Sequence, residues 1–91
     1  MRLSTTDLAI AREVTAELLE ELRLDGYLFE VEPGQDQWSL RIECGAEEGW
    51  EMTSVSIAPE DLLAARNDPA RRQTLLTDLR NHLASCKTSG S

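Results

Sequence analysis

The sequence lacks any long hydrophobic run. None of its apolar stretches approaches the ~20 residues that a helix needs to cross a bilayer. Its first residues, 1–4, do not open a signal peptide either, because no long apolar segment follows them and a carboxylate arrives at Asp7. We therefore expect a cytoplasmic protein that does not engage a membrane.

Cysteine and histidine are scarce, since Cys44, Cys86 and His82 are the only ones. In a reducing cytoplasm the two cysteines are expected to be free thiols rather than a disulfide. The three side chains could in principle meet at a zinc ion, but there is no Cys-x-x-Cys pair and the fourth ligand would have to come from elsewhere. We predict that the protein holds no metal and no cofactor, and that both cysteines are small core residues.

The motifs of the common enzyme classes are also missing. The chain has no Gly-x-Ser-x-Gly elbow, no phosphate-binding glycine loop and no His-Glu-x-x-His zinc motif. A thiol nucleophile needs an exposed electropositive setting, which Cys44 on the apolar side of a strand would not have. We predict a protein that is not an enzyme.

Acidic residues, in contrast, are abundant and unevenly distributed. Of 17 acidic residues, fifteen fall within residues 1–61, together with only four of the 9 basic residues. This part carries a net charge of −11 and residues 62–91 carry +3, which gives −8 for the chain. Such a surface repels phosphate groups and attracts a basic protein surface, so we expect no direct nucleic-acid binding. The alternative is that the charge serves solubility alone.

Hydrophobic periodicity predicts an α+β domain with the order α-β-β-β-α-α. A helix over 5–24 follows from apolar residues at three- and four-residue spacing, with Ser4 or Thr5 as its cap and Gly26 at its end. Strands over 27–32, 37–44 and 50–57 follow from alternation, with 45–49 as the connecting loop. Pro59 opens a short helix to about residue 66, and Asp68 caps a last helix over 69–86.

Tight connections between the strands favour a three-stranded antiparallel meander with the first and last helices packed on one face. We expect one domain over 1–87 and a frayed tail over 88–91. The third strand is ambiguous, because Val55 and Ile57 share one parity while Trp50 and Met52 share the other. Either a bulge changes its facing, or Trp50 and Met52 lie on the second face of the sheet.

Two groups of residues are candidates for partner binding. Tryptophan is enriched in interface hot spots. Trp38 has the same parity as Leu40 and Ile42, so we expect it in the core. For Trp50 the sequence supports a core position and an interface position equally. Beside Trp50, the acidic loop would form an aromatic and acidic patch, and the first helix offers a row of carboxylates. The predicted partner-binding residues are Glu13, Glu17, Glu20, Glu47, Glu48, Trp50 and Glu51.

Our leading hypothesis is a non-enzymatic module that binds a basic protein surface as an adaptor, regulator or inhibitor. A sharper form of it is DNA mimicry, in which carboxylates stand where phosphates would. One alternative is a structural subunit of a homo-oligomer, such as a homodimer, or of a larger assembly, built on Leu28 and Met52 or on an exposed edge strand. A further alternative is a small metal-assisted or thiol enzyme. In the last helix, Arg71 points aside, while Arg72 could cover the core edge, pair with the first helix or anchor an interface.

The element order is similar to that of double-stranded RNA-binding domains, which require a basic start to the last helix. Arg71 and Arg72 occupy that position, but the chain lacks the lysine cluster of the family. The first helix and meander also resemble the opening of the small, acidic, dimeric type III secretion chaperones, which continue with two further strands. In size and acidity the chain is similar to phage-encoded DNA-mimic inhibitors such as anti-CRISPR proteins. No motif assigns it to any of these families.

Overall fold

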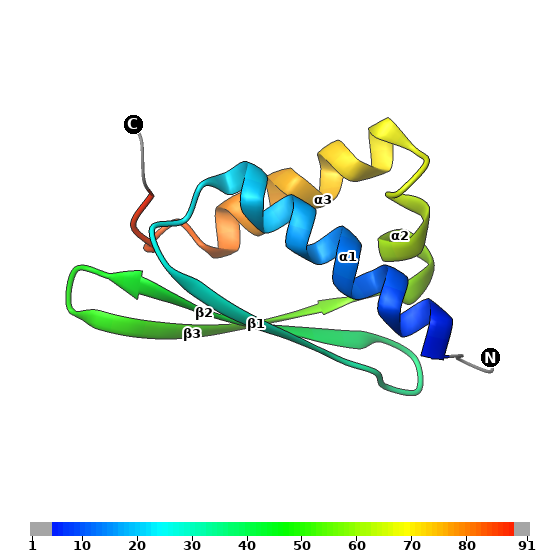
Figure 1. Cartoon of the computed structure of the whole chain (residues 1–91), viewed down its shortest axis with the longest axis horizontal. Helices are drawn as coiled ribbons and strands as arrows, with labels where there is room; N and C mark the ends of the chain where they lie inside the picture. The colour runs from blue at the N-terminus through cyan, green and yellow to red at the C-terminus, as the bar shows by residue number, and fades with distance from the viewer. Residues whose placement is uncertain (1–4, 89–91) are drawn as a thin grey trace.

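A computed structural model of the chain describes residues 5–88 (Figure 1). The elements are α1 (Thr5–Leu22), β1 (Tyr27–Glu32), β2 (Trp38–Ala46), β3 (Gly49–Ile57), α2 (Pro59–Ala64) and α3 (Pro69–His82). The strands form one antiparallel sheet in the order β1-β2-β3. This confirms the predicted α+β meander. The structure describes neither Ser4, the candidate helix cap, nor residues 89–91 of the expected tail.

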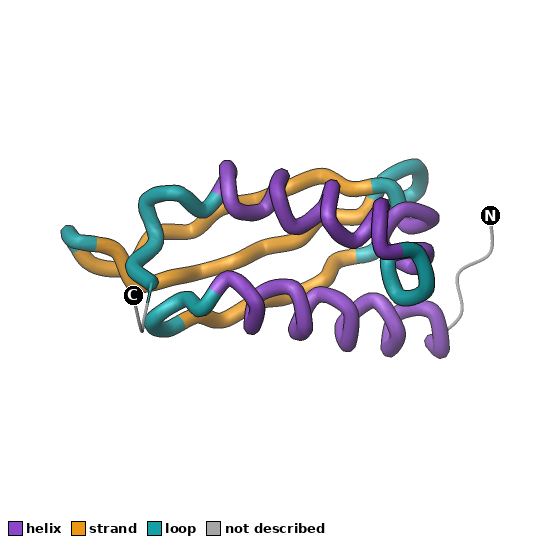
Figure 2. Tube along the Cα trace, turned by 90° about the horizontal axis from the view of Figure 1, so that it is seen from above, coloured by secondary structure: helices purple, strands orange, loops and turns teal. Residues whose placement is uncertain are grey.

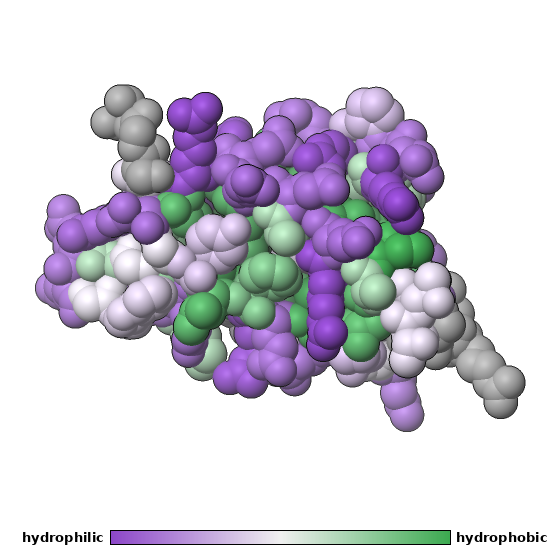
Figure 3. All heavy atoms as spheres, in the orientation of Figure 1, coloured by the Kyte–Doolittle hydropathy of each residue, from purple (hydrophilic) through white to green (hydrophobic). Residues whose placement is uncertain are grey.

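All three helices lie on one side of the sheet (Figures 1 and 2). Helices α1 and α3 run along it, with α1 in contact with β1 and α3 in contact with β3, while α2 packs against both helices. Figure 3 shows apolar side chains gathered between the helical layer and the sheet. The core includes Trp38, Leu40 and Ile42 of β2, all fully buried, so the core position predicted for Trp38 is confirmed.

Helix α1 ends earlier than predicted. Its last residue is Leu22, and Arg23 takes the left-handed conformation, with φ of 56°. Gly26 was expected in this role because glycine adopts positive φ without a steric penalty. It lies instead beside the sheet, where its carbonyl accepts a hydrogen bond from Gly45 N at 3.1 Å.

The β2–β3 hairpin is longer than the sequence suggested. Pairing runs without interruption from Trp38 with Ile57 to Ala46 with Gly49, so Glu47 and Glu48 alone form the turn. The predicted loop over 45–49 is therefore mostly strand. Gly49, with φ of 121°, supplies the positive φ that closes the hairpin. Because the register has no bulge, Trp50 and Met52 lie on the second face of the sheet.

Helix α3 also stops before its predicted end at residue 86. The segment that follows turns back to the sheet, where Lys87 N donates to Gly45 O at 2.7 Å and Asp25 N donates to Lys87 O at 2.8 Å. Thr88 forms a β-bridge with Leu24. These bonds replace the helical ones and bring Cys86 against β2.

Candidate protein-binding surface

The face of the sheet that points away from the helices carries no other element of the described chain (Figure 1). Side chains alternate between the two faces of a strand, so the residues of one parity form this surface. We call it the outer face, and its residues are Leu28, Glu30 and Glu32 of β1, Ser39, Arg41, Glu43 and Gly45 of β2, and Trp50, Met52, Ser54 and Ser56 of β3.

Large apolar side chains are exposed at one end of the outer face. Leu28, Met52 and Trp50 are 63%, 57% and 65% exposed. Glu43 pairs with both Leu28 and Met52, so these two side chains flank its carboxylate. Trp50 pairs with Gly45, and its Cη2 atom lies 3.9 Å from where a Cβ on Gly26 would be. The indole therefore extends across the central strand. Grouped exposed apolar side chains are typical of interaction surfaces.

The outer face is acidic around this apolar group. Arg41 is its one basic residue, and it donates to Glu32 Oε1 at 2.9 Å and to Met52 Sδ at 3.4 Å. The hydrogen bond and charge of Glu32 raise the pKa of Arg41, with smaller contributions from Glu30 and Glu43. After the Arg41–Glu32 pair, two carboxylates remain, so the outer face carries a net charge of −2.

The acidic row predicted on α1 lies on the other side of the molecule. Glu13, Glu17 and Glu20 are all exposed there. The row is interrupted, because Arg72 of α3 donates to Glu17 at 3.2 Å and to Glu21 at 2.6 Å. Of the alternatives considered for Arg72, the structure shows the ion pair with the first helix, and this pair neutralises the middle of the row.

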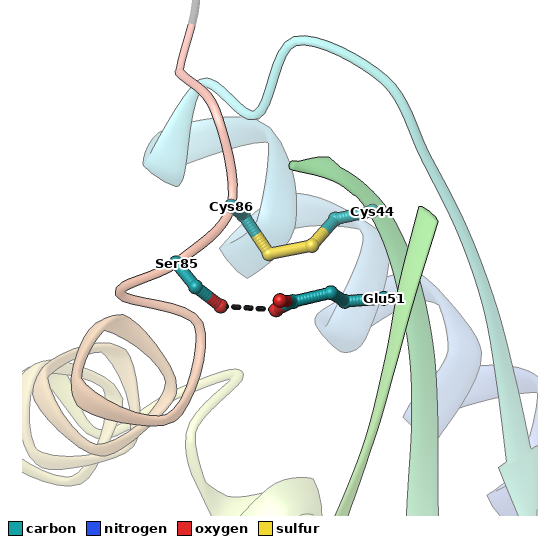
Figure 4. The surroundings of a disulfide bond; sticks show 4 residues. All are labelled: Cys44, Glu51, Ser85 and Cys86. Carbon is teal, nitrogen blue, oxygen red and sulfur yellow. Dashed lines mark hydrogen bonds between the residues drawn. A yellow bond between two sulfur atoms is a disulfide. The ribbon is translucent and has the colours of Figure 1, made fainter. Parts of the chain in front are cut away.

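The second predicted group stays together at the end of the β2–β3 hairpin but is divided between two faces. Glu47 and Glu48 form the turn, and Trp50 lies on the outer face. Glu51 points to the opposite face, where its carboxylate accepts a hydrogen bond from Ser85 (Figure 4). Trp50 shares the outer face instead with Leu28, Met52 and Glu43. From the sequence, Leu28 and Met52 were predicted only as contacts in a larger assembly. Glu43 was not predicted as a site residue, although it pairs with both of them.

The two cysteines were expected from the sequence to be free thiols, and this expectation is wrong. Cys44 and Cys86 form a disulfide, with Cα atoms 5.6 Å apart, that joins β2 to the segment after α3 (Figure 4). That expectation came from the assumed compartment, and it is wrong because the C-terminal segment folds back onto β2. The predicted burial of both cysteines is confirmed. The cytoplasmic location stays a prediction.

The disulfide also bears on the zinc hypothesis, since two of its three proposed ligands bind each other. His82 Nδ1 lies 2.8 Å from the carbonyl oxygen of Asp78. Among residues 5–88, no group of three His, Cys, Asp or Glu side chains could hold a metal ion. No helix in this part of the chain is long and apolar enough to cross a membrane.

Comparison of the chain with protein-family models, curated proteins and solved structures finds no match.

Proposed function

We propose that this chain is a non-enzymatic protein-binding domain that engages a basic partner through its outer face. The observation that supports the proposal is the exposure of Leu28, Met52 and Trp50 on a sheet face that no helix covers, with Glu43 between two of them. Such a surface suits a partner that places apolar side chains over the apolar group and lysine or arginine beside Glu30 and Glu43.

Charge favours a basic partner over a second copy of the chain. Each copy carries −8, and the outer face itself carries −2, so two outer faces would repel each other. DNA mimicry by the α1 row has less support, because Arg72 neutralises its centre.

Affinity capture from the lysate of the native host tests the proposal with paired variants. In an outer-face variant, Trp50→Ala and Met52→Ser remove apolar groups that are already exposed, so the fold should persist. In an α1 variant, Glu13→Gln and Glu20→Gln remove two charges far from this face. We expect the wild type and the α1 variant to retain a basic partner that moderate salt releases, because salt screens exposed charges over about 10 Å at 0.1 M.

The outer-face variant should lose that partner. Loss of the partner from the α1 variant, with retention by the outer-face variant, would move the binding surface to the helical side and contradict the proposal.

A further inference from the structure

The backbone of β3 offers an open hydrogen-bonding edge. Gly45 N donates toward β1, to Gly26 O. In an antiparallel sheet the N–H and C=O groups of successive residues point alternately to the two sides of a strand. Those of Cys44 and Ile42 therefore point to β3, where their partners are Glu51 and Thr53. It follows that β3 directs four sets of backbone groups to the open edge, those of Trp50, Met52, Ser54 and Ser56.

This edge has few of the usual devices that prevent strand pairing, and Glu51 is its one charged residue. Native edge strands are commonly short, or carry proline, lysine or a bulge. Strand β3 has 9 residues, none of them proline, lysine or arginine, and its pairing with β2 is continuous. The other edge strand, β1, has 6 residues, is followed by Pro33 and carries Glu30 and Glu32. Strand β3 is thus the more open template.

The side chains near this edge specify what could pair with it. A residue hydrogen-bonded to Trp50 or Met52 would place its side chain on the outer face, beside their apolar groups. Its neighbours in sequence would point to the opposite face, beside Glu51. Glu47 and Glu48 add negative charge at the same end. Together with Glu51 they line a shallow hollow, in which Lys87 is the one basic lining residue.

We propose that β3 binds an extended segment of the partner as a fourth strand, and that this segment alternates apolar and basic residues. This inference rests on the proposed function and names its mode of binding, in which backbone hydrogen bonds give affinity and alternate side chains give specificity. The apolar residues of the segment would meet the outer face and its basic residues would meet Glu51, so the basic groups beside Glu30 and Glu43 would come from other parts of the partner.

A short fluorescein-labelled peptide that alternates valine and lysine is a direct probe. Titrated into the oxidised wild-type protein, it should bind, and amide hydrogen exchange should slow by roughly tenfold or more at Trp50, Met52, Ser54 and Ser56. A peptide with glutamate in place of lysine should not bind. N-methylation of the valines, whose N–H groups would face β3, should abolish binding, whereas N-methylation of the lysines should preserve it.

Variants at Ser54 test the same edge from the protein side. Ser54→Pro removes an outward N–H without removing a bond to β2, and proline is tolerated on edge strands. It should weaken peptide binding roughly tenfold or more, while Ser54→Ala, which keeps the N–H, should bind as the wild type does. The N-methylated peptides keep the test decisive if Ser54→Pro does not fold.

Binding without slower exchange at the four amides would mean that the segment lies on the outer face without pairing. That result would overturn the inference and leave the proposed function standing. Failure of the lysine peptide to bind, or equal binding of the glutamate peptide, would also overturn it. So would concentration-dependent protection of the same amides in the protein alone, since the occupant would then be a second copy. Failure of the proposed function is a separate result, seen as unchanged partner capture by the outer-face variant.

Discussion

The two tryptophans occupy opposite environments, although both lie in the same hairpin. Trp38 is fully buried, and its Nε1 has no hydrogen-bond partner among the described residues. Trp50 is 65% exposed. Parity in the second strand was enough to place Trp38 in the core. It could not place Trp50, because the facing of the third strand depends on a register that only the pairing with β2 reveals.

Substitution of each tryptophan by alanine should therefore give very different losses of stability. Trp38→Ala removes a buried indole and should lower the free energy of unfolding by about 3–5 kcal/mol. Trp50→Ala should change it by about 0.5 kcal/mol or less, because the side chain is already in solvent. Urea denaturation followed by circular dichroism measures both. Similar losses for the two variants would show that Trp50 is part of the core.

Arg72 is the residue through which α3 is held to α1 electrostatically. Its hydrogen bond to Glu21, followed by the charges of Glu21 and Glu17, raises its pKa against the opposing effect of burial. A raised pKa in the folded state means that the protonated form stabilises the fold. That contribution is present below the normal pKa of arginine and is lost only as the pH rises through the higher value, in strong alkali.

Arg72→Gln should lower the free energy of unfolding by about 0.5–1 kcal/mol at low salt, because both carboxylate partners are largely exposed. The difference from the wild type should shrink in 1 M salt, where the screening length falls to about 3 Å. Paired urea titrations at the two salt concentrations measure it. Arg71→Gln, which breaks an ion pair to Asp61 of α2 instead, is the matched control. A loss for Arg72→Gln that is independent of salt would assign its role to packing of the side-chain stem.

At the scale of elements, the sequence predicted the order and type of every helix and strand, and the bounds of β1 without error. Alternation and capping residues are local signals, and they were sufficient to assign the type of each element and the bounds of β1. The errors lie where distant segments meet. Gly45 and Ala46 extend β2 because they pair with Trp50 and Gly49, and the chain leaves helix α3 because Lys87 bonds to Gly45. Neither contact has a local signature.

The disulfide is the strongest of these long-range links, since Cys44 and Cys86 are 42 residues apart. In the chain-entropy account, closing a loop of this length stabilises the fold by about 4 kcal/mol, within a usual range of about 2–4 kcal/mol. Reduction with dithiothreitol should therefore lower the urea midpoint of the wild type clearly. A Cys44→Ala/Cys86→Ala variant should start lower and be unaffected by the reductant. An equal midpoint for oxidised and reduced wild type would contradict a stabilising role.

At the scale of the whole molecule, the net charge opposes the association of two copies. Two copies at −8 each repel, and neither the outer face nor the edge of β3 carries a basic residue that is free of a carboxylate partner. We expect a monomer at micromolar concentration and low salt, measured by gel filtration with light scattering. A stable dimer under these conditions would favour the alternative hypothesis of a structural subunit.

The proposed binding surface was only half predictable, because the sequence does not show which residues the pairing of the strands brings to one face. The distribution of charge along the sequence located the acidic part of the chain. For Trp50 the sequence allowed both an exposed and a buried position. Which carboxylates stand beside Trp50 depends on the sheet. Adjacency in sequence suggested Glu51, but adjacent residues of a strand point to opposite faces. The outer face that carries Trp50 also carries Glu43, which comes from β2 and pairs with Met52.

The fluorescence of Trp50 in a Trp38→Phe variant, where it is the one tryptophan, tests directly whether a partner binds the outer face. Its emission should be red-shifted and readily quenched by acrylamide in the free protein. Saturation with the basic partner recovered by affinity capture should shift the emission to the blue and protect it from acrylamide, and added salt should reverse both changes. If Trp50 remains red-shifted and fully quenchable in the saturated complex, the partner does not bind the outer face.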